Sequence, residues 1–172
     1  MAILPILSVP DPRLKATALP VSVVDDAIKR LVQDMFETMY DDDGVGLAAT
    51  QVGITKRIIV IDFKDQMTPR PLCLINPEII WASDETRMFQ EGCLSVPDQW
   101  DEVERYAEVK VRYWDEHGKD QELHAREILS ACVQHEIDHL NGILFIDHLS
   151  KLKRQLMVQR AIKVHKKITK GK

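Results

Sequence analysis

The sequence predicts an α+β fold in which antiparallel β-sheets pack around a central helix, with one further helix near each end of the chain. Strand-like segments dominate the middle of the chain, whereas helical periodicity is confined to three separated segments. That order indicates α+β rather than alternating βαβ units. The 172 residues suit a single domain, residues 1–172, with a substantial core, and no internal repeat or linker interrupts them.

The N-terminal part is expected to be irregular and then helical. Four prolines interrupt residues 1–24 and forbid a continuous helix there. Asp25 or Asp26 can cap a helix that runs to about residue 40, because apolar residues follow at helical spacing. The run of three aspartates and a glycine at residues 41–44 ends that helix.

The strands are predicted from apolar or alternating segments bounded by turn residues. A proline is expected to stop a strand because it cannot donate to the ladder. The predicted strands are residues 56–63, residues 72–76 up to Pro77, residues 78–82 as a candidate continuation, the alternating stretch 103–113, residues 121–125 after a turn at 117–119, and the short segment 143–146.

The central helix, residues 127–141, carries the motif His135-Glu-Ile-Asp-His139. Residues four apart share one face of a helix, so the two imidazoles can converge on one metal ion. Glu136 lies beside them, close enough to reach a water on that ion without binding it. Apolar flanks indicate a buried helix, in which unsatisfied histidines and acids would be costly. The alternative is that these are ordinary polar side chains.

A third ligand is needed for a metal centre. Downstream of His139 the spacing typical of one zinc-peptidase class places Phe145 where a histidine would be required, and no glutamate follows. Upstream, Cys93 is expected in a glycine-containing turn within a loop. A thiolate and two imidazoles leave one position open for water, as in a catalytic metal site. The alternative for Cys93 is a buried free thiol.

Charge is distributed unevenly along the chain. From residue 151 onward there are nine Lys or Arg and no acid, so the preceding residues carry a balance of −13. A last helix is expected from about Ser150, with Leu152, Leu156 and Ile162 on its apolar side. The first residues lack a basic segment and a long apolar run, so neither a signal peptide nor a membrane span is expected there. Three cysteines in unlike contexts favour a reducing cytoplasm over a disulfide framework.

Three segments together resemble one family. Gly44-Val-Gly-Leu-Ala-Ala-Thr-Gln51, Glu91-Gly-Cys-Leu-Ser95 and the 135–139 motif are similar to the three signatures of peptide deformylases, as are residues 10–14 and Arg105. The resemblance implies a metal-dependent hydrolase that removes the N-formyl group from the formyl-methionine of newly synthesised proteins and releases formate. The remaining alternatives are another metal-dependent amidase or peptidase, and a non-catalytic ribosome- or RNA-binding metalloprotein.

The resemblance also implies roles for individual residues. From the residues alone, Gln51 would be a surface glutamine and residues 44–46 a plain loop. The implied roles are metal binding by Cys93, His135 and His139; proton transfer by Glu136; oxyanion donation by the Gln51 amide and the Leu94 backbone N–H; pairing with the substrate backbone by Gly44 and Gly46; a methionine pocket lined by Val45, Phe89, Ile128 and Cys132; and an ion pair between Glu91 and Arg105.

Cofactor and partners follow from the same resemblance. Sulfur and nitrogen ligands suit Zn²⁺, whereas the resemblance implies one Fe²⁺ per chain, with Zn²⁺, Ni²⁺ or Co²⁺ possible in purified protein. The expected partners are N-formylmethionyl nascent peptides and, through the basic helix at 151–172, the ribosome. No membrane partner is expected, and a monomer is expected because no unpaired apolar stripe stands out. His117, His124 and His165 are expected to be solvated and Cys73 to be a core thiol.

Overall fold

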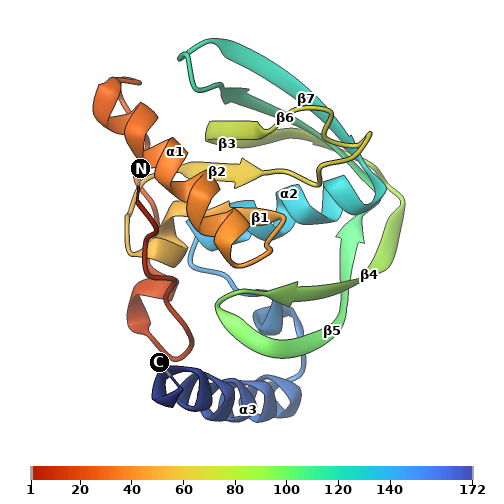
Figure 1. Cartoon of the computed structure of the whole chain (residues 1–172). Helices are drawn as coiled ribbons and strands as arrows, with labels where there is room; N and C mark the ends of the chain where they lie inside the picture. The colour runs from red at the N-terminus through yellow and green to blue at the C-terminus, as the bar shows by residue number, and fades with distance from the viewer. Residues whose placement is uncertain (1, 172) are drawn as a thin grey trace.

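The structure, a computed structural model, describes residues 2–171. It contains three α-helices, three short 3₁₀ helices and seven strands among these residues (Figure 1). The elements are η1 Pro12–Lys15, α1 Asp26–Asp41, β1 Gly46–Ala48, η2 Ala49–Val52, β2 Ile58–Ile61, β3 Leu72–Ala82, β4 Thr86–Cys93, β5 Val96–Tyr106, β6 Glu108–Trp114, β7 Asp120–Arg126, α2 Glu127–Leu140, η3 Phe145–His148 and α3 Lys151–Lys170.

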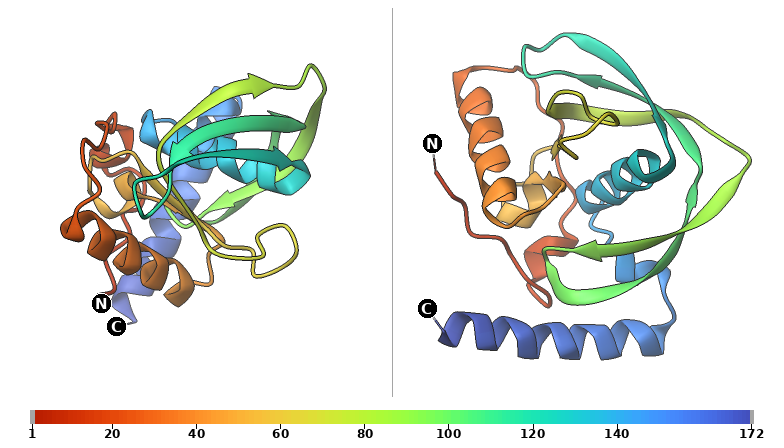
Figure 2. Two further views of the ribbon diagram at one scale, coloured as in Figure 1. Left: turned by 90° about the horizontal axis from the view of Figure 1, so that it is seen from above. Right: turned by 45° about the vertical axis from the view of Figure 1, so that its right-hand side comes forward.

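The strands form two antiparallel sheets. The larger has the order β1-β2-β3-β6-β7, and the smaller is the β4–β5 hairpin. Helix α2 lies between the large sheet and the hairpin, and α1 covers the other side of the strands near β1 (Figures 1 and 2). The predicted combination of three helices with antiparallel sheets is therefore confirmed. No helix among residues 2–171 is long and apolar enough to cross a membrane.

Strand β2 is buried on both faces and joins two parts of the core. Ile59 and Ile61 pack in one apolar cluster with side chains of α2, whereas Ile58 and Val60 pack in another with side chains of α1. Successive side chains of a strand point to opposite faces, so an unbroken apolar run suits a strand between two helices. This packing holds α2 in place from the sheet side.

The caps of α1 and α3 agree with the predicted starts. The Asp25 carboxylate accepts a hydrogen bond from the Ile28 N–H at 2.9 Å, and the Ser150 hydroxyl accepts one from the Lys153 N–H at 3.2 Å. Each cap satisfies one of the backbone donors that the first turn of a helix leaves free.

The predicted apolar side of the C-terminal helix is wrong. Of the three predicted residues, Leu152 and Leu156 are 67% and 40% exposed and Ile162 is half-buried, whereas Met157 and Ala161 are buried. Met157 and Ala161 belong to a cluster with side chains of β5 and η3. The small Ala161 allows the helix to approach the hairpin closely, and this contact decides which stripe of α3 faces the body.

Pro77 does not stop its strand, contrary to the prediction. Strand β3 continues past it because the register with β6 shifts between Ile75 and Glu78. Within this bulge Asn76 has φ +52°, and its side chain bonds both the N–H and the carbonyl of Val21 at 2.8 Å. A proline at a bulge removes no ladder hydrogen bond, so the sheet tolerates it.

Two further local predictions differ from the structure. Residues 143–146 were predicted to form a strand, but they lead into the 3₁₀ helix η3. Cys93 was expected within a loop, yet it is the last residue of β4, directly before the turn at residues 94–95. The β4–β5 hairpin extends far beyond the predicted strand. Strand β4 was missed because it lacks a regular alternation of apolar and polar residues: Thr86, Arg87 and Gln90 are exposed, and Glu91 is buried.

Candidate metal centre and substrate cavity

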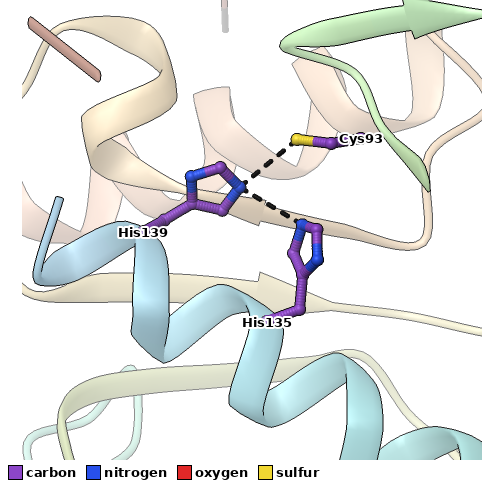
Figure 3. Close-up of side chains that lie close together, drawn as sticks. All are labelled: Cys93, His135 and His139. Atoms are coloured by element: carbon purple, nitrogen blue, oxygen red, sulfur yellow. Dashed lines mark hydrogen bonds between the residues drawn. The ribbon is translucent and has the colours of Figure 1, made fainter. Parts of the chain in front are cut away.

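Helix α2 and the end of β4 bring three possible metal ligands together. His135 and His139 lie one turn apart on α2, and Cys93 approaches them from the hairpin (Figure 3). His139 Nε2 is 3.3 Å from Cys93 Sγ and 3.2 Å from His135 Nε2, and all three donor atoms lie within 4.8 Å of one another. Both histidines are buried. The prediction that these three residues converge is therefore confirmed.

These donors fit a tetrahedrally bound transition-metal ion. Bonds of about 2.0–2.1 Å to nitrogen and 2.3 Å to sulfur place neighbouring tetrahedral donors roughly 3.3–3.6 Å apart. Two of the separations here, 3.2 and 3.3 Å, are close to that range. Burial, and the neighbouring His135, lower the pKa of His139 well below its ordinary value, which keeps its imidazole in the neutral form that binds metals.

A buried ionic chain orients His135. Glu91 Oε1 lies 2.8 Å from His135 Nδ1, which leaves Nε2 facing the other two donors. Arg105 donates two hydrogen bonds to Glu91, at 2.7 and 2.9 Å, and a third to Asp138 at 2.7 Å. Burial acts to raise the pKa of Glu91, but its hydrogen bonds with Arg105 and His135 outweigh this effect and hold the pKa below its ordinary value.

Asp138, whose role the sequence left open, extends that chain outward. Its carboxylate pairs with Arg105 and lies 2.8 Å from His148 Nε2. The link between Glu91 and Arg105 was expected from the resemblance, whereas the involvement of Asp138 and His148 was not. The sequence offered one signal for Asp138: it is an acidic residue that lies between the two histidines of the 135–139 motif.

Glu136 lies beside the three donors without bonding to any of them. It is 4% exposed, and its Oε2 atom has no hydrogen-bond partner in the described part of the chain. Burial raises its pKa to about 7. A Cβ atom placed on Gly46 would be only 2.7 Å from Glu136 Oε1, so the absence of a side chain at this position makes room for the carboxylate.

Gln51 is buried rather than a surface residue, contrary to the expectation from the residues alone. It is 1% exposed and belongs to η2. Its Oε1 accepts a hydrogen bond from the Ala48 N–H at 2.9 Å. Its amide nitrogen is then directed to Ser95 Oγ at 3.1 Å and to Cys93 Sγ at 3.5 Å. The side-chain amide therefore has a fixed orientation, with its donor end at the metal centre.

A cavity of about 550 Å³ opens beside the metal centre. Its wall includes two of the three candidate ligands, Cys93 and His135, together with Glu136 and residues of the turn that follows β4. The cavity also brings together all six residues that the resemblance implies for substrate binding, and Leu94. Those six are Gly44, Val45, Gly46, Phe89, Ile128 and Cys132. Trp100 and Ile168 line it as well, and the sequence did not indicate either of them.

A second cavity, of about 690 Å³, lies between η1, η3 and α3 and contains none of the candidate ligands. Its charged groups satisfy one another, since Lys15 and Arg154 both pair with Asp147. The larger volume of this second cavity therefore does not identify it as the active site. Convergent donors and an unpartnered buried carboxylate distinguish the smaller cavity.

His117, His124, His165 and Cys73 do not line the cavity beside the candidate metal centre. The His117 side chain is 65% exposed, His165 is also exposed, and Cys73 is buried in the core, as expected. His124 is only partly exposed, because its ring packs edge-on against Trp81.

The fold and the site define a hydrolase-type metal centre, in which three donors from two elements face a buried carboxylate and an adjoining cavity. The polypeptide deformylase family model matches residues 3–155. Curated peptide deformylases of Rhizobium meliloti and Phenylobacterium zucineum are 48% and 51% identical to the chain, over 96% and 97% of its length and 96% and 99% of theirs. The crystal structure of peptide deformylase from Ehrlichia chaffeensis superposes with a TM-score of 0.92 at 40% identity, covering 98% of this chain and 99% of that one.

The chain therefore belongs to the polypeptide deformylase family. The reaction of that family is removal of the N-formyl group from nascent peptides, so the chain is an enzyme. A second Ehrlichia chaffeensis structure, 43% identical with a TM-score of 0.91 over 95% of this chain and 98% of that one, is a complex with actinonin.

Proposed function

We propose that the chain hydrolyses the formyl amide of N-formylmethionyl peptides, with Glu136 as the group that moves the proton. One observation carries this proposal: the unpartnered Glu136 carboxylate lies in the same cavity as the converging donors of Cys93 and His135. A structural metal site has no use for such a carboxylate. Glu136 would take a proton from the attacking water and deliver it to the leaving amine nitrogen.

We propose Cys93, His135 and His139 as the ligands of one divalent ion, Fe²⁺, and regard Zn²⁺, Ni²⁺ and Co²⁺ as ions that can replace it. The donor set and its spacing support a transition metal but do not choose among these ions. When bound, such an ion supplies Lewis-acid chemistry: it acidifies water and polarises a carbonyl group. Metal analysis of protein purified without oxygen, together with its turnover, tests the choice of iron.

The developing oxyanion requires hydrogen-bond donors, and we assign them to the Gln51 amide and the Leu94 backbone N–H. The Ala48 N–H holds the Gln51 side chain by its oxygen, so the nitrogen is already directed at the site before substrate arrives. A donor that is oriented in advance is worth about 2.7–4 kcal/mol of barrier in comparable oxyanion holes.

The substrate backbone would pair with β1. This strand is at the edge of the large sheet, and within residues 2–171 it pairs with β2 alone, so an extended peptide could add to its outer side. Gly46 is the first residue of β1, Gly44 lies two residues before it, and both line the cavity. Recognition through main-chain hydrogen bonds would tolerate varied side chains after the formylated methionine.

The methionine side chain would occupy the cavity, in contact with Val45, Phe89, Ile128 and Cys132. Burial raises the pKa of the Cys132 thiol well above its ordinary value, so this residue stays neutral and contributes an apolar wall. The formyl group is small, and the position of Glu136 against Gly46 leaves little room for a larger acyl group.

The test is formate release from formyl-methionyl-alanyl-serine by protein purified without oxygen. The matched acetyl peptide and a chelator-treated sample are the controls. We expect rapid release that the chelator abolishes, and near-inert behaviour of the acetyl peptide. Equal turnover of both peptides would instead favour a general amidase, and no turnover by metal-replete protein would favour a non-catalytic metalloprotein.

We further propose that residues 1–172 are one catalytic domain and that its basic helix, 151–172, docks on the ribosome. The enzyme would then act as a cytoplasmic monomer. Residue 172 lies outside the described residues. Within α3, Lys153 and Arg154 pair with Asp101 and Asp147 of the body, whereas Lys163, Lys166, Lys167 and Lys170 are exposed.

Deleting α3 would uncover the cluster around Met157 and Ala161, so charge reversal is the better test of docking. Changing the four exposed lysines to glutamate should abolish co-sedimentation with ribosomes and leave tripeptide turnover unchanged. The protein–RNA attraction should also weaken as salt rises. Unchanged co-sedimentation of the variant would eliminate this docking mode.

A further inference from the structure

The C-terminal end of α3 reaches the substrate cavity. Ile168, two residues before the end of the helix, lines this cavity together with residues of α2, β4 and the α1–β1 connection. Helix α3 crosses beneath the β4–β5 hairpin on its way there (Figures 1 and 2). The helix therefore links the hairpin side of the body to the cavity wall.

Ile168 continues the stripe of α3 that faces the body. Met157, Ala161, Val164 and Ile168 follow one another at spacings of four, three and four residues, which places them on one face of a helix. The first two are buried and Val164 is half-buried. Ile168 is on the same face but 49% exposed. The stripe thus extends past the packed body and borders the cavity.

Ile168 lies at the mouth of the cavity and not at its inner end. Glu136 and His135, at the inner end, are 4% and 7% exposed, whereas Ile168 and Trp100 are 49% and 63% exposed. A formylated terminus must reach the inner carboxylate, so the residues that follow it leave through the mouth. An apolar side chain at the mouth is therefore placed to contact a side chain of the bound peptide.

We infer that Ile168 is a specificity-determining residue, which contacts an apolar side chain among the residues that follow the formylated methionine. This inference rests on the proposed function, because it concerns the same cavity and the same substrate. The contact removes apolar surface of both partners from water, so it strengthens binding without touching the reacting bond. It should appear in KM and leave kcat unchanged.

The test compares two kinds of substrate. Formyl-Met-Ala has only an alanine after its methionine and so offers no large apolar side chain to the mouth, whereas formylated tetrapeptides with one leucine at position two, three or four, and alanine elsewhere, offer one at each position in turn. In the variant I168D we expect KM to rise at least about threefold for one of the leucine peptides, as expected for losing a half-buried apolar contact. The kinetic constants for formyl-Met-Ala should not change.

The chain offers a matched control on the same helix. Leu152 is 67% exposed and does not line the cavity, so L152D adds the same charge away from the mouth. The neutral variant I168A should raise KM for the same leucine peptide, whereas the conservative variant I168L should keep KM close to the wild-type value. Circular dichroism of all variants checks that α3 remains helical.

The outcomes separate the two ideas. If wild-type protein turns over none of the peptides, the proposed function itself fails. If wild-type protein is active and I168D shows the wild-type KM for every leucine peptide, the inference about Ile168 is wrong. An equal rise of KM in I168D and L152D would also overturn it, because the effect would then come from charge alone.

Discussion

Replacing Arg105 by alanine should destabilise the protein strongly and weaken its metal centre. The Arg105 side chain is 4% exposed and donates three hydrogen bonds, two to Glu91 and one to Asp138. Without it, the Glu91 carboxylate, at 7% exposure, keeps only its contact with His135. Breaking a buried pair in this way leaves an uncompensated charge and costs about 3–5 kcal/mol. For a chain of this size that loss lowers the melting temperature by about 6–20 °C.

The neighbouring strand supplies the control. Arg87 lies directly opposite Arg105 in the hairpin and also pairs with carboxylates, those of Glu85 and Glu127. Its side chain is 46% exposed, so water replaces the lost partner and R87A should leave the melting temperature nearly unchanged. Thermal unfolding of both variants is followed with a chelator present, because bound ion would add its own stabilisation.

A second measurement addresses the metal. Because Arg105 fixes Glu91 and Glu91 fixes His135, R105A should bind Co²⁺ or Zn²⁺ about 10–100-fold more weakly in competition with a chelator. R87A should bind the ion as the wild type does. A melting temperature of R105A within 2 °C of that of R87A, a margin equivalent to about 1 kcal/mol, would refute the reasoning about the buried charge.

Three further outcomes are expected. G142A should lose roughly 1–3 kcal/mol of unfolding free energy, measured by urea denaturation. The reason is that Gly142 has φ +74° and an added Cβ would be 2.4 Å from the Lys15 carbonyl oxygen. The control G118A should lose less, because Gly118 has φ +77° but an added Cβ there would meet no atom closer than 3.5 Å. G46A should lower kcat with little change in the melting temperature, because the new methyl group displaces the Glu136 carboxylate, and an unchanged kcat would contradict that position. E136A should lose at least about a hundredfold in turnover. Its affinity for the ion, measured by competition with a chelator, should stay within a few-fold of the wild-type value. Retained turnover would exclude Glu136 as the proton carrier.

The sequence identified the three candidate metal ligands because they are close in sequence or chemically distinctive. The i, i+4 spacing of His135 and His139 depends only on helix geometry, and Cys93 was the remaining soft donor in a suitable context. Gln51 is different: nothing in its local sequence indicates burial, and only the resemblance implied a role. Its burial results from packing between β1 and the hairpin turn, which no local pattern encodes.

Other features depend on tertiary contacts that periodicity cannot express. In α3 the larger residues Leu152 and Leu156 suggested the buried face, yet the helix packs through Met157 and Ala161 because the hairpin requires a close approach. Asp138 acquires its partner only when β5 delivers Arg105 to α2. The β4–β5 hairpin was incompletely predicted because its strands carry many charged residues, which single-strand propensity does not favour.

The arrangement of the ligands has a consequence for the whole chain. Cys93 and His135 are 135 − 93 = 42 positions apart in the chain, and they belong to the two-stranded hairpin and to helix α2 respectively. An ion held between these two candidate ligands would be a cross-link that closes a long loop, and the chain would be constrained in this way only while the ion is bound. Isolated two-stranded hairpins are marginally stable in water. Metal supply and the free energy of unfolding would then be thermodynamically linked, so a shortage of the ion would lower the stability of the folded chain as well as its turnover.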